Sequence, residues 1–494
     1  MEYDLVIVGA GPAGLALAQR ATAPRVLIID EHTTIGGCHR VERVTDAGIF
    51  TEHGPRVYST AYLTFRKLLK EAGLDFNKLF TPYKFNIGSI GGQTIFRRLS
   101  ARELAWLAVE FGRLMVDPSH GTRTAMADFM RARDFRPASV EVVDRLCRLT
   151  DGGGADRFSL NEFLELFNQQ LFYRLYQPRA PNDVGLFPLW RRALERTGRV
   201  RFMLGARADR LVAGPAGVES LVVSAAGAET AVRGKAFVLA IPPVQIAALL
   251  GASRGLQDSF GPFDQLSRFA ETTKYDVYVS LTLNWRARAV VPRVYGFPWS
   301  DWGVIFVNLT DYMSMGEYGS VLSVAVTLID APSRRTGKTA NACPPDELIE
   351  EVLHQLAYLG IPRPDLCAIS PGNTHDGQRW RSADSAYIST GGLGGLPQAG
   401  ATANLFNVGS HNKLGAYKFT TMETAVQNSC ALASRLYPGA AAAVPPQVFT
   451  VRLAIILVLL LIIILACAPT VARALRGRAA KPQKHKFFGN WLDI

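Results

Sequence analysis

The sequence predicts an α/β protein in which a Rossmann-type dinucleotide-binding domain is interleaved with an α+β domain and followed by a C-terminal transmembrane helix. Three observations carry this prediction. The chain opens with an apolar run, a glycine loop and a small-residue helix, VIVGAGPAGLALAQ, and a second apolar run, RVLIID, follows. Long segments with helical and then alternating periodicity separate two further strand patterns. Near the end, LAIILVLLLIIILACAPTVA carries no charge.

The glycine loop has the spacing of a dinucleotide-binding turn. Gly9 allows the tight turn, Gly11 lets the backbone approach a pyrophosphate, and Gly14 lets the helix pack closely on the strand. Pro12 and Ala13 stand between the last two glycines, at the expected start of the helix. The N-terminus of that helix then faces the phosphates.

An acidic residue and a second glycine pair follow this loop. Asp30 ends the second apolar run, where a carboxylate accepts a ribose hydroxyl, and Glu31 is next to it. Gly36 and Gly37 allow a second close approach of backbone to the diphosphate. This pair resembles the two-glycine extension of FAD-binding oxidoreductases, and it favours FAD over NAD alone.

The uncharged run at 453–472 spans about 30 Å as a helix, the thickness of the hydrocarbon core of a bilayer. A Pro- and Ala-rich linker precedes it and a basic tail follows it, which disfavours a buried core helix. The first residues form the nucleotide-binding strand and helix and leave no room for a secretory signal. We therefore expect a single-pass tail anchor with a cytosolic body, in the mitochondrial outer membrane or the endoplasmic reticulum, although the positive-inside rule alone would place the tail in the cytosol.

The net charge is +12, and the tail from Arg473 contributes six positive residues and one negative residue. This charge predicts contact with anionic lipid head groups rather than with nucleic acid. The six cysteines have no metal-ligand spacing, so neither a metal site nor a disulfide framework is expected.

Changes of periodicity divide the chain into eight segments. The dinucleotide-binding domain is expected at 1–74, 196–254 and 401–437. The second domain is expected at 75–195, mostly helical, and at 255–400, mostly an antiparallel sheet. The linker, the membrane span and the basic tail are expected at 438–452, 453–472 and 473–494.

The order of motifs over nearly the whole body resembles the flavin amine oxidoreductase superfamily, which includes monoamine and polyamine oxidases, protoporphyrinogen oxidase and phytoene desaturases. After the glycine loop, the acid and the glycine pair come Ile241-Pro242-Pro243 and Met422-Glu423-Thr424-Ala425. The combination is much more specific than any one motif.

The resemblance implies further cofactor contacts. Ala208 would meet the adenine, Gly409 and Ser410 would contact phosphate or ribityl, and the helix that begins near Thr421 and Met422 would point its amides at the flavin. Along the flavin would lie Arg40, Gly54, Pro55 and Arg56.

The resemblance also implies catalytic residues. Lys274 matches a lysine that holds a water near flavin N5, although a surface lysine at a strand start explains it equally well. Trp380 and Tyr387 match a segment that forms one aromatic wall of the substrate site. Ala386 replaces the cysteine that carries the flavin in monoamine oxidases, so FAD is expected to be non-covalent, and Thr421 replaces the second aromatic wall.

The expected activity is that of an FAD-dependent oxidase or dehydrogenase in which a substrate C–H transfers hydride to flavin N5, in the manner of an amine oxidase. A membrane-anchored desaturase or porphyrinogen-type oxidase of a lipophilic substrate is the alternative. A non-oxidising flavoprotein, either an isomerase or mutase or a scaffold, is a further one. His39, His53 and His411 also fall near the expected cofactor, where proton transfer and plain hydrogen bonding both stay open. The substrate, the electron acceptor and the oligomeric state stay open as well.

Overall fold

The computed structural model describes residues 2–44, 48–83, 98–168, 173–275, 278–290, 300–383, 387–388, 390, 392–415, 417–418, 420–443 and 451–479. It divides into two units, each described here by itself. One comprises Met1–Phe167 with Tyr173–Pro446, and the other comprises Asn168–Phe172 with Gln447–Ile494.

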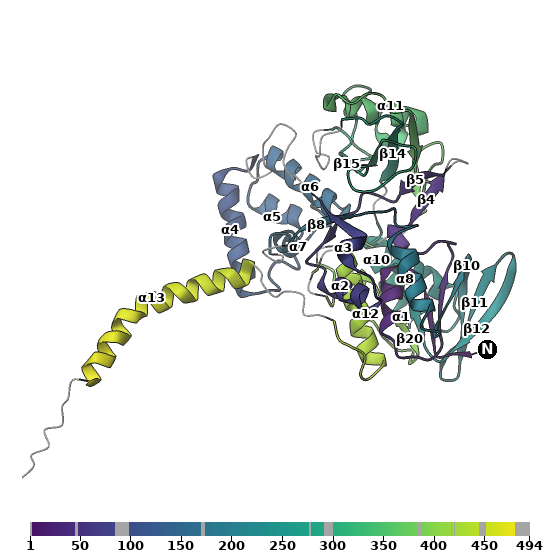
Figure 1. Cartoon of the computed structure of the whole chain (residues 1–494), viewed down its shortest axis with the longest axis horizontal. Helices are drawn as coiled ribbons and strands as arrows, with labels where there is room; N and C mark the ends of the chain where they lie inside the picture. The colour runs from purple at the N-terminus through teal and green to yellow at the C-terminus, as the bar shows by residue number, and fades with distance from the viewer. Residues whose placement is uncertain are drawn as a thin grey trace, which may run out of the picture. The chain divides into compact units, whose positions relative to one another are not determined.

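The first unit contains a five-stranded parallel sheet, whose strand β20 is labelled near helices α1 (Pro12–Arg20) and α12 (Met422–Leu436) in Figure 1. Its strand order is β20 (Leu405–Asn407), β13 (Phe237–Leu239), β2 (Leu5–Val8), β3 (Val26–Asp30) and β9 (Val200–Leu204). The strands are apolar and mostly buried, as expected for a parallel sheet covered on both faces. Three segments that lie far apart in the sequence therefore build one sheet, which confirms the predicted interleaving.

Helices α1 (Pro12–Arg20) and α12 (Met422–Leu436) pack together beside this sheet. Ser429 Oγ on α12 donates a hydrogen bond to the carbonyl of Ala13 at 2.8 Å. A second sheet, in the order β1 (Glu2–Tyr3), β12 (Ala228–Gly234), β11 (Gly217–Ala225) and β10 (Ala206–Gly214), belongs to the same domain.

The 75–195 segment is mostly helical, as expected. Ser100 and Ser159 begin α4 (Ala101–Val116) and α7 (Leu160–Glu165) with complete capping boxes. The other helices of the unit are α2 (Leu63–Glu71), α3 (Phe76–Leu79), α5 (Met126–Ala132), α6 (Pro137–Asp151), α8 (Leu186–Glu195), α9 (Pro243–Gly251), α10 (Phe263–Thr272) and α11 (Pro345–Gln355).

The 255–400 segment contains the expected antiparallel sheet, in the order β15 (Val304–Asn308), β16 (Ser320–Val326), β14 (Val279–Trp285) and β17 (Leu366–Ile369). Alternate residues such as Leu281 and Val324 form a core with α11. The residues between them are smaller and more polar. The shorter strands are β4 (Val41–Val44), β5 (Ile49–Glu52), β6 (Tyr58–Ser59), β7 (Phe80–Pro82), β8 (Leu175–Pro178), β18 (Asn373–His375) and β19 (Trp380–Ser382).

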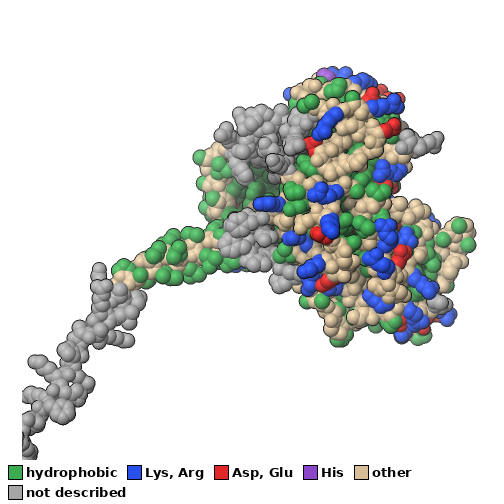
Figure 2. Space-filling model, in the orientation of Figure 1, with side chains coloured by type: hydrophobic (Ala, Val, Ile, Leu, Met, Phe, Trp, Pro, Cys, Tyr) green, Lys and Arg blue, Asp and Glu red, His purple; other side chains and the backbone are tan. Residues whose placement is uncertain are grey.

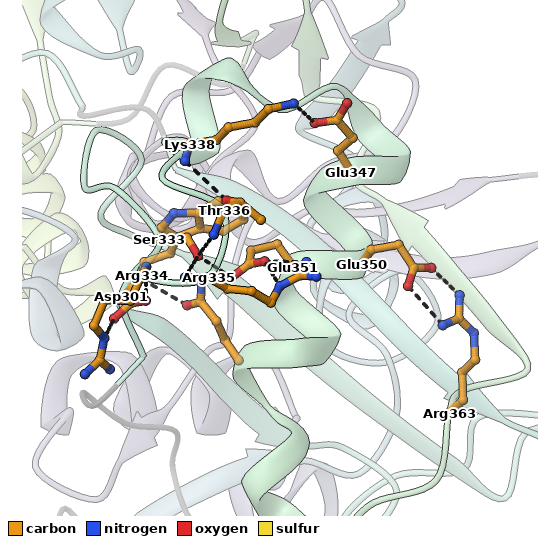
Figure 3. Close-up of polar contacts among 12 residues, drawn as sticks. Asp301, Ser333, Arg334, Arg335, Thr336, Lys338, Glu347, Glu350, Glu351 and Arg363 are labelled. Atoms are coloured by element: carbon orange, nitrogen blue, oxygen red, sulfur yellow. Dashed lines mark hydrogen bonds and ion pairs between the residues drawn. The ribbon is translucent and has the colours of Figure 1, made fainter.

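A buried carboxylate ties α11 to the loop before it (Figure 3). Glu351 is 1% exposed and accepts hydrogen bonds from Ser333 Oγ and Arg335 Nε, each at 2.6 Å. Gln355 Nε2 donates a third hydrogen bond at 3.0 Å. These bonds hold the pKa of Glu351 below its usual value, although burial alone would raise it.

The second unit contains α13 (Val451–Ala479), whose stretch Val451–Pro469 has a mean hydropathy of 3.2 and no buried residues. Hydrophobic side chains cover the described part of this helix (Figure 2). By length and composition it is a candidate membrane span that begins two residues before the predicted one. Most of the basic tail, from residue 480, lies outside the described residues.

We expect a chain that ends at residue 443 to stay in the supernatant when a detergent-free lysate is centrifuged at high speed. The full chain should sediment with the membranes, because only the full chain carries the apolar helix. Immunoblots of both fractions test this, and the interpretation of α13 fails if the two chains distribute alike.

Candidate functional site

A cavity of about 640 Å³ opens at the carboxyl ends of the strands of the parallel sheet. Its wall includes Val8 at the end of β2, Asp30 at the end of β3, Ala240 after β13 and Val408 after β20. Open α/β sheets bind ligands at this edge. The structure therefore brings the three dinucleotide-binding segments together around one space.

The first turn accepts only glycine at two positions. Gly9 has φ +109°, and a Cβ added to it would lie 2.4 Å from the carbonyl oxygen of Ala240. A Cβ on Gly14 would lie 2.0 Å from the carbonyl oxygen of Gly9. Strand β2 and helix α1 thus join as the sequence predicts. Gly9 lines the cavity, whereas Gly14 packs behind it.

The two glycine loops face each other across the cavity floor. A Cβ on Gly11 would lie 3.5 Å from the Cα of Gly37, and Gly37 itself has φ +56°. Gly36, with φ +132°, donates its N–H to the carbonyl of Ala10 at 3.0 Å and so joins the loops. The floor is bare backbone beside the start of α1, which fits a diphosphate.

Pro12 and Ala13 line the same floor.

Asp30 accepts hydrogen bonds from the first glycine loop and from the residues that follow β3. One carboxylate oxygen accepts the N–H of Ala10 at 2.7 Å and the other accepts the N–H of His32 at 2.9 Å. Each oxygen keeps a further lone pair for a ligand hydroxyl. Glu31 and Ala208 line the same end of the cavity. The structure therefore places all three predicted residues in the cavity wall, and their contacts with ribose and adenine stay predictions.

Two arginines, Arg40 and Arg56, also line the cavity. Arg40 is buried and lies 3.3 Å from Glu42. Arg56 donates to the carbonyl of Cys38. Burial alone would lower the pKa of Arg56, but nearby groups, Cys38 first among them, raise it above its usual value, so Arg56 stays charged. Two positive charges beside the backbone floor suit a ligand that carries phosphates.

Gly54 and Pro55 also line the cavity.

Helix α12 begins where the sequence predicts. Thr421 is its N-cap, and the Thr421 hydroxyl accepts the N–H of Thr424 at 3.0 Å. Gly409 and Ser410 line the cavity together with Thr420 and Ala425, whereas Met422 is buried in the core. Thr421 and Met422 themselves do not line the cavity.

Glu423 has a role that sequence reasoning missed. Its fully buried carboxylate accepts the N–H groups of Thr64 at 2.8 Å and Phe65 at 2.9 Å, in the first turn of α2. Gln427 Nε2 donates a further hydrogen bond at 2.9 Å. Burial raises the pKa of Glu423. The glutamate of the Met-Glu motif therefore caps a second helix and joins it to α12.

Two of the three predicted catalytic residues do not lie in the cavity wall. Lys274 follows α10 but precedes β14 by five residues, so its side chain is 56% exposed and its ammonium lies 4.0 Å from Glu271. The Trp380 indole is buried and donates to the carbonyls of Ala340 at 3.2 Å and Cys343 at 3.1 Å. These placements correct both expectations. Ala386 lies outside the described residues.

Tyr387 lines the cavity, with its ring centroid 6.0 Å from that of His411, and its place in a substrate wall stays a prediction.

The cavity also has an aromatic end that the sequence did not reveal. Tyr275, Tyr278 and His53 line it. The rings of the two tyrosines lie 5.1 Å apart, and that of His53 lies 5.3 Å from Tyr275 and 4.9 Å from Tyr278. Both tyrosines lie between Lys274 and the start of β14, and this proximity is the one signal that could have indicated them.

Two of the three histidines near the expected cofactor are neutral. Burial lowers the pKa of His411 to about 3, and its Nε2 lies 3.0 Å from Asn407 Oδ1. Burial also lowers the pKa of His39, which lies 3.3 Å from the Tyr58 hydroxyl. Both therefore act as neutral hydrogen-bonding groups at physiological pH.

Glu52, at the end of β5, is a buried carboxyl next to this wall. It is 8% exposed, and burial raises its pKa to about 7, although a Ser323 hydrogen bond and the charge of Arg56 oppose the shift. A raised carboxyl pKa means that the folded chain binds the proton more tightly than the unfolded chain does. The free energy of unfolding therefore falls as the pH rises from about 4.5 to about 7.

We expect Glu52→Gln to be more stable than the parent above pH 7, by on the order of 3 kcal/mol, because the variant avoids ionising a buried carboxyl. The difference should shrink toward pH 4.5. Urea unfolding at pH 5 and pH 8 measures it, with the exposed Glu219→Gln as the control. An equal difference at both pH values would mean that Glu52 does not titrate in this range.

Comparisons with known proteins agree with this geometry. Residues 7–72 match the NAD(P)-binding Rossmann-like domain family. None of the curated proteins matches the chain. Among solved structures, wild-type putrescine oxidase bound to putrescine is similar, with 17% identity, a TM-score of 0.58, and coverage of 88% of this chain and 99% of that one.

Two other solved structures are similar over the same extent. Cyclohexylamine oxidase from Brevibacterium oxydans has 13% identity and a TM-score of 0.55, with 88% and 100% of the two chains covered. A proposed protoporphyrinogen oxidase from Exiguobacterium has 16% identity and a TM-score of 0.52, with 88% and 99% covered. At these identities the likeness shows that this chain shares their fold.

Proposed function

We propose that the chain is an FAD-dependent oxidoreductase of the flavin amine oxidoreductase superfamily. The observation that carries this proposal is the cavity itself. Two facing glycine loops form its floor at the edge of the parallel sheet, and the same cavity continues to an aromatic end where Tyr275 and Tyr278 of the second domain meet His53. A dinucleotide fits the first part, and the second part leaves room for a substrate.

The proposed cofactor-binding residues fall into groups according to the part of FAD that each would contact. Gly9, Gly11, Pro12, Ala13 and Gly37 hold the diphosphate on bare backbone, with Gly14 and Gly36 shaping the turns. Asp30 and Glu31 bind the ribose, and Ala208 lies by the adenine. Along the rest of the molecule lie Arg40, Gly54, Pro55, Arg56, Gly409, Ser410 and the start of α12 at Thr421 and Met422. Because residue 386 is alanine, the proposed FAD is non-covalent.

FAD, when bound, would supply the redox chemistry, which is acceptance of a hydride from a substrate carbon and transfer of the two electrons to oxygen or another acceptor. The chain supplies the surroundings. The positive end of α12 and the charge of Arg56 favour negative charge in the cavity, and Tyr387 and the aromatic end exclude water. The neutral His411 offers a hydrogen bond without adding charge.

An amine is the proposed substrate class, because structures with this fold and near-complete coverage include putrescine and cyclohexylamine oxidases. The test is anaerobic mixing of the purified protein with putrescine, cyclohexylamine and benzylamine. Bleaching of the visible flavin absorbance by an amine, with recovery on admitting oxygen, supports the proposal. A flavin that no amine or lipophilic substrate bleaches overturns it and favours an isomerase or a scaffold.

A desaturase or porphyrinogen-type oxidase is the second candidate. The candidate membrane span Val451–Pro469 favours it, since an anchored enzyme meets lipophilic substrates in the bilayer. Bleaching by a porphyrinogen or a polyprenoid, and not by amines, selects this alternative. We also propose that the body faces the cytosol and that the anchor lies in the mitochondrial outer membrane or the endoplasmic reticulum. Protease treatment of intact organelles, followed by immunoblotting of the body, tests that topology.

A further inference from the structure

The aromatic end of the cavity is built from three parts of the chain. His53 follows β5, Gly152 is the C-cap of α6, and Tyr275 and Tyr278 lie between α10 and β14. The ring centroids of His53, Tyr275 and Tyr278 are 4.9 to 5.3 Å apart, and the two tyrosine rings meet edge to face. All four residues line the cavity. Such spacing is favourable for aromatic contacts.

Two glycines leave room for the hydroxyl groups of the tyrosines. A Cβ on Gly54 would lie 2.7 Å from the Tyr278 hydroxyl oxygen, and a Cβ on Gly152 would lie 2.1 Å from that of Tyr275. Gly152 has φ +80°, as the helix C-cap requires. Each hydroxyl therefore occupies space that a side chain at the neighbouring glycine would fill.

Three aliphatic residues line the cavity on elements near these rings, together with the more polar Arg148, Thr150 and Thr327. Ala325 pairs with Ser280, two residues after Tyr278, and Ile305 pairs with Ala325 on the next strand. Leu149 lies about one helical turn before Gly152. Leu149, Ile305 and Ala325 all line the cavity. A pocket wall that contains aromatic rings and aliphatic side chains favours a flat or cyclic apolar group.

We propose that His53, Tyr275 and Tyr278 form the specificity-determining wall of the substrate site and that the substrate carries an aryl or cycloalkyl ring there. This inference rests on the proposed function and narrows its substrate class. The charged Arg56 lies close to both tyrosines, so a second positive charge on the substrate is disfavoured at this end. Ring-bearing monoamines are therefore preferred over linear diamines.

Binding of benzamide and acetamide to the full-length protein tests the wall without requiring turnover. We expect calorimetric titration to show benzamide binding at least about tenfold more tightly than acetamide. Tyr275→Leu and Tyr278→Leu should each weaken benzamide about tenfold, whereas Tyr275→Phe and Tyr278→Phe should stay within about threefold of the parent, because the ring is kept. Tyr358→Leu, at an exposed tyrosine outside the cavity, is the matched control.

Flavin content is measured for every variant. If a leucine variant does not fold, Ala325→Val gives a second test, since it fills space beside the rings and should weaken benzamide without removing a ring. Unchanged benzamide affinity in the leucine variants, or equal affinity for the two amides in the parent, overturns the inference. Anaerobic bleaching by cyclohexylamine and benzylamine reports separately on the proposed function, so the two failures are distinguishable.

Discussion

Gly11→Val is expected to give a folded protein without flavin. Gly11 has φ −79°, which every residue adopts, and the atom nearest to an added Cβ is the Cα of Gly37 at 3.5 Å, so the backbone tolerates a side chain. The branches of valine would then project from the place where the two glycine loops meet, against which the diphosphate is proposed to lie. We expect at least a hundredfold loss of FAD affinity and an unchanged far-ultraviolet circular dichroism spectrum.

Gly112→Ala provides the control for this experiment, because Gly112 lies in α4 with no heavy atom within 4 Å of an added Cβ. It should keep the cofactor and gain slightly in stability. Gly14→Val should behave differently from Gly11→Val, since its Cβ would collide with the Gly9 carbonyl and disturb the fold itself. If Gly11→Val retains FAD with parental affinity, the diphosphate does not lie against these two glycine loops.

The second large effect is expected at Glu423. Glu423→Ala removes the acceptor for the two N–H groups of Thr64 and Phe65 and leaves both without a partner in a buried place. Each unpaired buried donor costs about 1–3 kcal/mol, so the free energy of unfolding should fall by about 2–6 kcal/mol. Guanidinium unfolding of the flavin-free protein measures this change and avoids a contribution from cofactor binding.

Two further variants identify the cause. Glu423→Gln keeps one acceptor oxygen and should lose roughly half as much stability. Glu347→Ala breaks only the exposed ion pair with Lys338, at 2.7 Å, and should cost less than about 1 kcal/mol. A Glu423→Ala variant as stable as Glu347→Ala would show that this carboxylate does not secure α2.

The dinucleotide-binding part of the fold was predictable because its signals are local. A tight turn, a close approach of backbone and a helix start each require particular residues at fixed spacing, and Gly9, Gly14 and Asp30 stand at those places. The signal for the candidate membrane span is equally local, since a long apolar run needs no partner to be recognised. The start of α12 at Thr421 and Met422 was predictable for the same reason.

The substrate end was less predictable because it depends on where a strand begins and which segments meet. Lys274 was expected to open a strand, but β14 starts at Val279, and Lys274 is turned to solvent. Trp380 was expected in the aromatic wall of the substrate site, yet its indole N–H donates to the carbonyl of Ala340 inside the core around α11. The aromatic wall of His53, Tyr275 and Tyr278 joins segments more than 200 residues apart, and no spacing in the sequence indicates such a meeting.

The absorbance spectrum of the natively purified full-length protein tests the central claim most directly. The proposed function predicts a yellow protein with one FAD per chain, released intact by denaturation because Ala386 offers no point of covalent attachment. A colourless protein that also fails to bind added FAD would contradict the proposed function, since the cavity beside the glycine loops would then not be an FAD site.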